Sequence, residues 1–119
     1  MDNEEISFGC SIFSNEKVLS CSFGLTQNEL EMLKLIIRKD EILFVKEISE
    51  LLNKNRTTIQ KTLKNLLEKD FIKRKQINRD KGFAYGYFPL KKHEYITLFN
   101  KKLKGIKESI HDQINQWYE

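Results

Sequence analysis

The sequence predicts a mainly α-helical fold of the α+β class, and three observations predict it. Apolar residues recur at three- and four-residue steps in successive segments between residues 26 and 69, the period of helices with one buried face. Two aromatic and β-branched stretches within residues 71–88 flank a polar turn, as in a β-hairpin. Residues 91–118 contain no proline and one glycine, which favours a single long helix. We therefore expect an N-terminal arm over 1–25, a core domain over 26–90 and a C-terminal helix over 91–119.

The arm is the least regular part of the chain. Residues 6–25 are serine-rich and punctuated by glycine, with apolar residues but no sustained helical period. This composition predicts an arm with short extended pieces that packs on the body. The acidic start, residues 1–5, is not followed by an apolar core segment, so no secretory signal is expected. With no long apolar run, we expect a cytoplasmic protein and no membrane partner.

The first helix begins at Thr26. Its hydroxyl can accept from the Glu29 amide while the Glu29 carboxylate reaches back to the Thr26 amide, which is a capping box. The apolar face then continues to about Lys39 through Leu30, Leu33, Ile36 and Ile37.

A short strand and a second helix are expected next. The apolar segment 42–44 could form a single minor strand. The helix that follows, Val45–Leu52, lacks a Ser, Thr, Asp or Asn cap, so its start is less well defined. Its predicted buried residues are Ile48, Leu51 and Leu52. Residues 53–55 are polar and suit a turn between helices.

The third helix begins after Asn55, a predicted N-cap whose side chain would accept from the Thr58 amide. It ends near residues 69–70. Its predicted core face contains Ile59, Leu63, Leu66 and Leu67. Its outward face is polar and basic and contains Arg56, Thr57, Gln60, Lys61 and Lys64.

The hairpin has arms over residues 71–77 and 83–88, joined by a polar turn over 78–82. Pro89 ends the second arm because proline has no amide to donate. We interpret Tyr85 and Tyr87 as packing residues of the hairpin; base-stacking platforms are the alternative.

The predicted C-terminal helix is about 40 Å long, more than a domain of this size needs to close its core. Its apolar residues follow a 3-4-3-4-7 spacing, a heptad seam interrupted at Gln113. The seam consists of Ile96, Phe99, Leu103, Ile106, Ile110 and Trp117. Such a stripe favours a partner, and the simplest partner is a second copy of the chain. Trp117 and Tyr118 are interpreted as dimer contacts, with a ligand cage as the alternative.

The charges are unevenly distributed. Residues 53–81 carry ten lysines and arginines against three acidic residues, whereas residues 1–31 carry one lysine against six acidic residues. Positive charge thus gathers on the third helix and the hairpin, where a polyanion would dock. A merely solvated lysine-rich surface is the alternative.

The order helix, strand, helix, helix, hairpin is that of a winged helix-turn-helix, whose third helix enters the DNA major groove. The N-terminal part of that helix carries residue types that read base edges, and two lysines further along suit phosphates. The hairpin tip would lie on the backbone or in the minor groove. The predicted DNA-binding residues are Asn55, Arg56, Thr57, Thr58, Gln60, Lys61, Lys64, Asn78, Arg79 and Lys81.

Other function classes are less well supported. The same fold also serves as a protein-interaction adaptor that does not bind DNA specifically. An enzyme is not expected, since no phosphate loop, paired carboxylates or nucleophile–histidine arrangement is apparent. Cys10 and Cys21 are too widely spaced for a C-x-x-C motif, so no metal and no cofactor is expected, although a redox switch stays open.

Beyond these patterns, residues 25–33, 45–52, 55–66 and 85–89 resemble the archaeal TrmB-type winged-helix regulators and, more distantly, MarR and ArsR proteins. Phe23-Gly24-Leu25 and Gln116-Trp117-Tyr118 match features of the short archaeal members. The resemblance implies a homodimeric, sequence-specific transcriptional regulator that binds double-stranded DNA. Larger members have a sugar-binding domain where this chain ends, so sugar sensing is not implied and any small-molecule effector is unknown.

Overall fold

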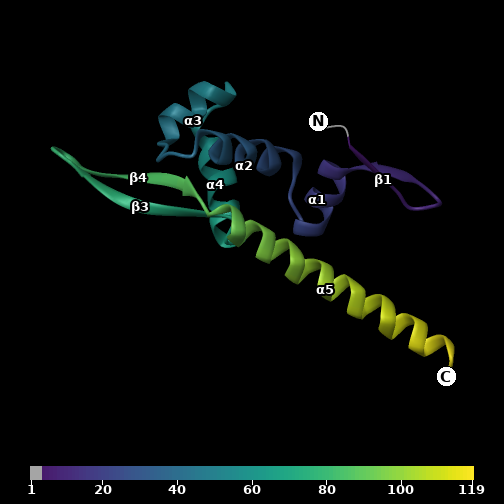
Figure 1. The fold of residues 1–119 in the computed structure, drawn as a ribbon. Helices are drawn as coiled ribbons and strands as arrows, with labels where there is room; N and C mark the ends of the chain where they lie inside the picture. The colour runs from purple at the N-terminus through teal and green to yellow at the C-terminus, as the bar shows by residue number, and fades with distance from the viewer. Residues whose placement is uncertain (1–3) are drawn as a thin grey trace. The chain divides into compact units, whose positions relative to one another are not determined.

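The computed structural model describes residues 4–119, which form two compact units (Figure 1). One unit is the continuous segment Thr26–Lys91. The other combines the described N-terminal residues up to Leu25 with Lys92–Glu119. The architecture is mainly helical, with two small antiparallel hairpins, and confirms the predicted fold class.

The central unit follows the predicted order. It contains α2 (Gln27–Lys39), α3 (Val45–Leu52), α4 (Arg56–Glu68), β3 (Ile72–Arg79) and β4 (Gly82–Pro89). The helix boundaries agree with the sequence because the caps are local. Thr26 and Glu29 form the predicted capping box. The expected minor strand is reduced to a single bridge, in which Leu43 and Tyr87 exchange backbone hydrogen bonds of 2.8 and 2.7 Å.

The core of this unit lies where α2 and α3 pack on α4. Its fully buried side chains are Met32, Ile36, Leu43, Ile48, Ile59, Leu63 and Leu66. Leu67 is half-buried rather than fully buried. Two residues of the predicted apolar faces are exposed: Leu51 is 49% exposed, and Ile37 of α2 is 41% exposed. Helix α3 is only eight residues long and buries Ile48, so the leucines of its last turn lie at the margin of the packed face.

The start of α3 has a partial cap that the sequence did not reveal. The Phe44 amide donates to Glu47 Oε1 at 3.3 Å. Phenylalanine has no side-chain acceptor, so only this half of a capping box forms. A glutamate at the third helical position therefore fixes the helix start without a polar N-cap residue.

The terminal unit differs from the predicted irregular arm. It contains the hairpin of β1 (Glu5–Ser7) and β2 (Ile12–Ser14), then α1 (Asn15–Phe23) and the long α5 (Lys92–Trp117). The predicted short extended pieces are present as β1 and β2, but no helix was predicted in this segment, and α1 is an addition. Its caps hold it: the Ser14 hydroxyl accepts from the Lys17 amide at 3.1 Å, and Gly24 adopts φ 66° after its last turn.

Helix α5 confirms the predicted long C-terminal helix, with 26 residues and no buried side chain. Two observations bear on the predicted seam, whose role in dimerisation stays a prediction. Ile114 is an exposed apolar residue next to Gln113, where the heptad spacing is interrupted, so exposed apolar residues continue between Ile110 and Trp117. Phe99 is half-buried and packs edge-to-face on Phe23 of α1, with ring centroids 5.9 Å apart. No helix within residues 4–119 is both long and apolar enough to cross a membrane.

Candidate nucleic-acid interface

The N-terminus of α4 is fixed by its cap. Asn55 Oδ1 accepts from the Thr58 amide at 2.8 Å, as the sequence predicted. One turn further, the buried Thr62 donates its hydroxyl to the Thr58 carbonyl at 2.9 Å. Thr58 itself is half-buried. These bonds hold the first two turns of α4 in one conformation, and they engage the Asn55 side-chain oxygen and the Thr58 backbone.

The outward face of α4 is exposed along its whole length. Its exposed residues are Arg56, Thr57, Gln60, Lys61 and Lys64. Asn55 is also exposed; its oxygen accepts from the Thr58 amide in the cap, which leaves its NH2 group and a second lone pair for a ligand.

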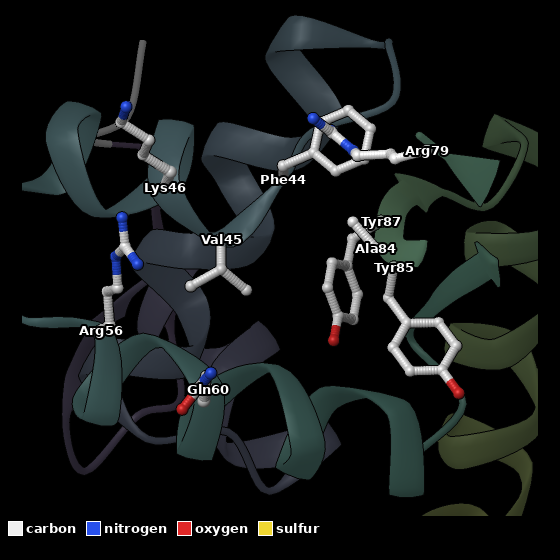
Figure 2. A pocket seen from close by; sticks show the side chains of 9 residues that line it. All are labelled: Phe44, Val45, Lys46, Arg56, Gln60, Arg79, Ala84, Tyr85 and Tyr87. Atoms are coloured by element: carbon white, nitrogen blue, oxygen red, sulfur yellow. The ribbon is translucent and has the colours of Figure 1, made fainter. Parts of the chain in front are cut away.

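A hollow of about 410 Å³ lies beside this face (Figure 2). Helices α3 and α4 and the β3–β4 hairpin all contribute to its wall. The lining residues are Phe44, Val45, Lys46, Arg56, Gln60, Arg79, Ala84, Tyr85 and Tyr87. Figure 2 shows Lys46 and Arg56 near one another on one side of the hollow and Arg79 on the other. The hollow therefore has an aromatic wall and cationic edges.

The hairpin tip is shorter than predicted. Residues 78–82 were expected to form the turn, but Asn78 pairs with Phe83 and Arg79 with Gly82 in the ladder. Only Asp80 and Lys81 form the turn, because Gly82 adopts φ 92° and lets the strand begin there. Lys81 thus lies at the tip, whereas Asn78 and Arg79 extend from β3.

Two arginines of β3 lie over aromatic rings. The Arg79 guanidinium is 4.5 Å from the centroid of the Phe44 ring, and the Arg74 guanidinium is 4.1 Å from that of Tyr85. Each stack orients a cation while leaving its N–H groups at the ring edge free to meet an anion. The Phe44–Arg79 contact also links the hairpin to the start of α3.

Lys46 is a candidate binding residue that the sequence patterns missed. It is exposed in the first turn of α3 and lines the same hollow as Arg56. A lysine in α3, the helix before α4, was the available signal in the sequence, but only the fold shows that the side chains of Lys46 and Arg56 share one hollow. Tyr87 is 7% exposed and Tyr85 is half-buried, which agrees with packing roles.

A buried carboxylate connects α2 to the end of α4. The Glu29 side chain, 3% exposed, accepts from Lys69 Nζ at 2.6 Å, from the Thr26 amide at 3.1 Å and from Asn65 Nδ2 at 3.4 Å. Burial raises the pKa of this carboxyl, but the hydrogen bond and charge of Lys69 and the Thr26 amide outweigh burial and lower its pKa overall. An ionised Glu29 thus ties the two helices together.

Possible metal ligands do not cluster in the part of the chain that the structure describes. Within residues 4–119, no three His, Cys, Asp or Glu side chains cluster as a ligand set. Cys10 and Cys21 are exposed free thiols, and both line a hollow in the terminal unit.

Two helices joined by a tight turn, a capped and exposed basic helix α4, and the hairpin beside it define a winged helix-turn-helix protein. Residues 19–96 match the family model described as "Sugar-specific transcriptional regulator TrmB", and the chain belongs to that family of transcriptional regulators.

Two individual proteins are similar to this chain over most of its length. The protein MJ1503 of Methanocaldococcus jannaschii is 27% identical over 114 residues, covering 92% of this chain and 80% of the relative. A solved structure described as a possible transcriptional regulator from Methanosarcina mazei has a TM-score of 0.91 and 26% identity, and covers 98% of this chain and 99% of that one.

A more distant structure shows the fold alone. The S. aureus MepR–DNA complex has a TM-score of 0.56 and 15% identity, covering 86% of this chain and 83% of that chain. Its description says that MepR is bound to DNA.

Proposed function

We propose that this regulator acts in the cytoplasm as a homodimer that binds a specific, roughly palindromic site in double-stranded DNA. In this proposal α4 enters the major groove and the hairpin lies on the backbone or in the minor groove. The half-sites would be about one helical turn, ~34 Å, apart. The observation that carries the proposal is the uninterrupted exposed face of α4 beside a hollow with cationic edges.

The chemistry of that face supports a division of roles. Arg56 and Gln60 are one helical turn apart and line the same hollow, so both can approach base edges together, Arg56 at guanine and Gln60 at adenine. Thr57 offers its methyl group to thymine. Lys61 and Lys64 lie further along α4 and suit phosphates.

Lys46 extends the phosphate contacts to α3. On the hairpin, Arg79 on its Phe44 support and Lys81 at the tip would follow the backbone beyond the major groove. Charged groups on three elements then hold the protein in register while α4 reads sequence.

The proposal is tested by selecting bound sequences from random duplexes and titrating the selected duplex, labelled with a fluorophore, at several salt concentrations. Affinity should fall steeply with salt, because phosphate contacts release counterions. Arg56→Ala should weaken binding by about tenfold or more at the selected site and much less on random DNA. Lys61→Ala should weaken binding to both and flatten the salt dependence.

The matched control is Lys39→Ala, which removes an exposed cation from the last turn of α2, outside the proposed interface. It should bind the selected duplex nearly as the parent chain does. Absent or salt-insensitive binding would contradict the proposal and favour a protein-interaction adaptor.

A further inference from the structure

The apolar stripe of α5 has an internal symmetry. From Ile110, the next exposed apolar residues lie four positions away on either side, at Ile106 and Ile114, and then three further away, at Leu103 and Trp117. At 3.6 residues per turn, all five side chains leave the helix within about 40° of one direction. The spacing of the exposed apolar residues is therefore the same on both sides of Ile110.

This symmetry matters for self-association. When two copies of α5 run antiparallel with Ile110 opposite Ile110, Ile106 lies opposite Ile114 of the second copy and Leu103 opposite its Trp117. Every apolar residue in this span then meets an apolar residue. An apolar hollow of about 460 Å³ in the same unit is lined partly by Ile106, so Ile114 of the second copy would lie at its edge.

The charges of α5 are unevenly distributed along its length, and their distribution also favours antiparallel pairing. Residues 92–107 contain five lysines against Glu94, whereas residues 108–119 contain three carboxylates and no lysine or arginine. In the antiparallel pair, residues 101–107 with their four lysines lie opposite residues 113–119 of the second copy, which contain Glu119 and no lysine or arginine. Glu108 lies opposite Asp112, but at 3.6 residues per turn both point away from the stripe. Parallel pairing sets like halves together, which is unfavourable at low salt.

The residues that flank the stripe also favour antiparallel pairing. Lys102 and Lys107 are exposed and lie on either side of it. In a parallel, in-register pair, Lys102 of one helix occupies the g position that faces Lys107 of the other at e, a like-charge contact. In the antiparallel pair, Lys102 lies opposite Tyr118 of the second copy and Lys107 opposite its Gln113, which removes that repulsion.

We propose that α5 pairs antiparallel with α5 of a second copy, with the two-fold axis passing beside Ile110. This inference rests on the homodimer of the proposed function and specifies its geometry. The occupant of the stripe is therefore a second copy of this chain rather than a different protein.

Disulfide trapping tests the geometry in the full chain with Cys10→Ser and Cys21→Ser as background. When two helix axes are 8–10 Å apart, Cα atoms that face each other at the two-fold axis are roughly 6 Å apart, close enough for a disulfide. Ile110→Cys should therefore cross-link to itself. Leu103→Cys alone should not, because its two copies lie about 21 Å apart along the antiparallel pair. Co-expressed Leu103→Cys and Trp117→Cys chains should cross-link to each other.

The outcomes separate the two proposals, with circular dichroism confirming that each variant keeps its helix content. Self-cross-linking of Leu103→Cys would overturn the antiparallel geometry while leaving a parallel dimer. If light scattering shows a dimer but Ile110→Cys does not cross-link, the proposed pairing of α5 with α5 is overturned and the homodimer is not. A monomer by light scattering with no cross-link in any variant would overturn both.

Discussion

Replacing Glu29 with alanine should destabilise the protein by about 2–3 kcal/mol. The change removes one acceptor from three donors: Lys69, the Thr26 amide and Asn65. Loss of the carboxylate half of the capping box costs about 0.5–1 kcal/mol, because the Thr26 hydroxyl still accepts from the amide of residue 29. A charge-assisted hydrogen bond contributes about 1.5–3 kcal/mol, and the lower end applies because the Lys69 side chain is 35% exposed and regains water. Urea unfolding followed by helix ellipticity measures the sum, and a loss below about 1 kcal/mol would refute the role assigned to this carboxylate.

The charge of Glu29 can be separated from its shape with Glu29→Gln, because the amide oxygen still accepts from the Thr26 amide. The pKa of Glu29 in the folded protein lies below its ordinary value of 4.5. Its ionised form therefore stabilises the fold fully above about pH 4.5, and this contribution is lost as the pH falls through the lowered pKa. The stability difference between the parent chain and Glu29→Gln should be largest near pH 7 and shrink towards pH 3. A difference that is constant over this range would show that the charge contributes nothing.

The neighbouring Glu31 supplies the matched control. Glu31 Oε2 lies 3.3 Å from Lys54 Nζ, and the two side chains are 46% and 28% exposed. An ion pair as exposed as this contributes less than about 1 kcal/mol. Glu31→Gln should therefore change stability little, although it removes the same charge from the same helix.

Substitutions at three other positions test separate parts of the fold. Asn55→Ala should destabilise α4 by about 1 kcal/mol, whereas Asn55→Asp should keep the cap but weaken DNA binding through its negative charge, as urea unfolding and duplex titration would show. Gly86→Ala should cost about 1–3 kcal/mol in thermal unfolding, because its Cβ would overlap Cγ2 of Ile42. Gly105→Ala should stabilise α5 by about 0.5–1 kcal/mol, since its Cβ would enter open space, and an unchanged or lower melting temperature would contradict this.

The elements that could be predicted from the sequence are those with local signals. Helix α2 begins at a capping box and α4 at an asparagine cap, and both signals lie within four residues of the boundary that they set. The long α5 was predictable because 26 residues in succession contain no proline. In each case the residues that determine the element are neighbours in the chain.

The rest depends on contacts between distant residues or on weak periodicity. Helix α1 has few buried residues, only Phe23 among its nine, so its apolar pattern is faint even though both caps are present. The position of Arg79 depends on Phe44, which is 35 residues away in sequence. Lys46 joins Arg56 only because α3 packs on α4. None of these contacts can be predicted from the residue pattern of a single helix or strand.

Helix α4 keeps its packing side chains and its proposed DNA-binding side chains on separate faces, which would let one fold read different DNA sites. Its core side chains, Ile59, Leu63 and Leu66, are fully buried, and the hydrogen bond from Asn65 to the Glu29 carboxylate joins its C-terminal half to α2. The residues of its outward face take no part in that packing, so substitutions there should alter affinity or specificity with little change in stability. Asn55 is the exception because its oxygen caps the helix at the edge of the same face. Changes in the site that is read should therefore come more readily from residues 56–64 than from the cap.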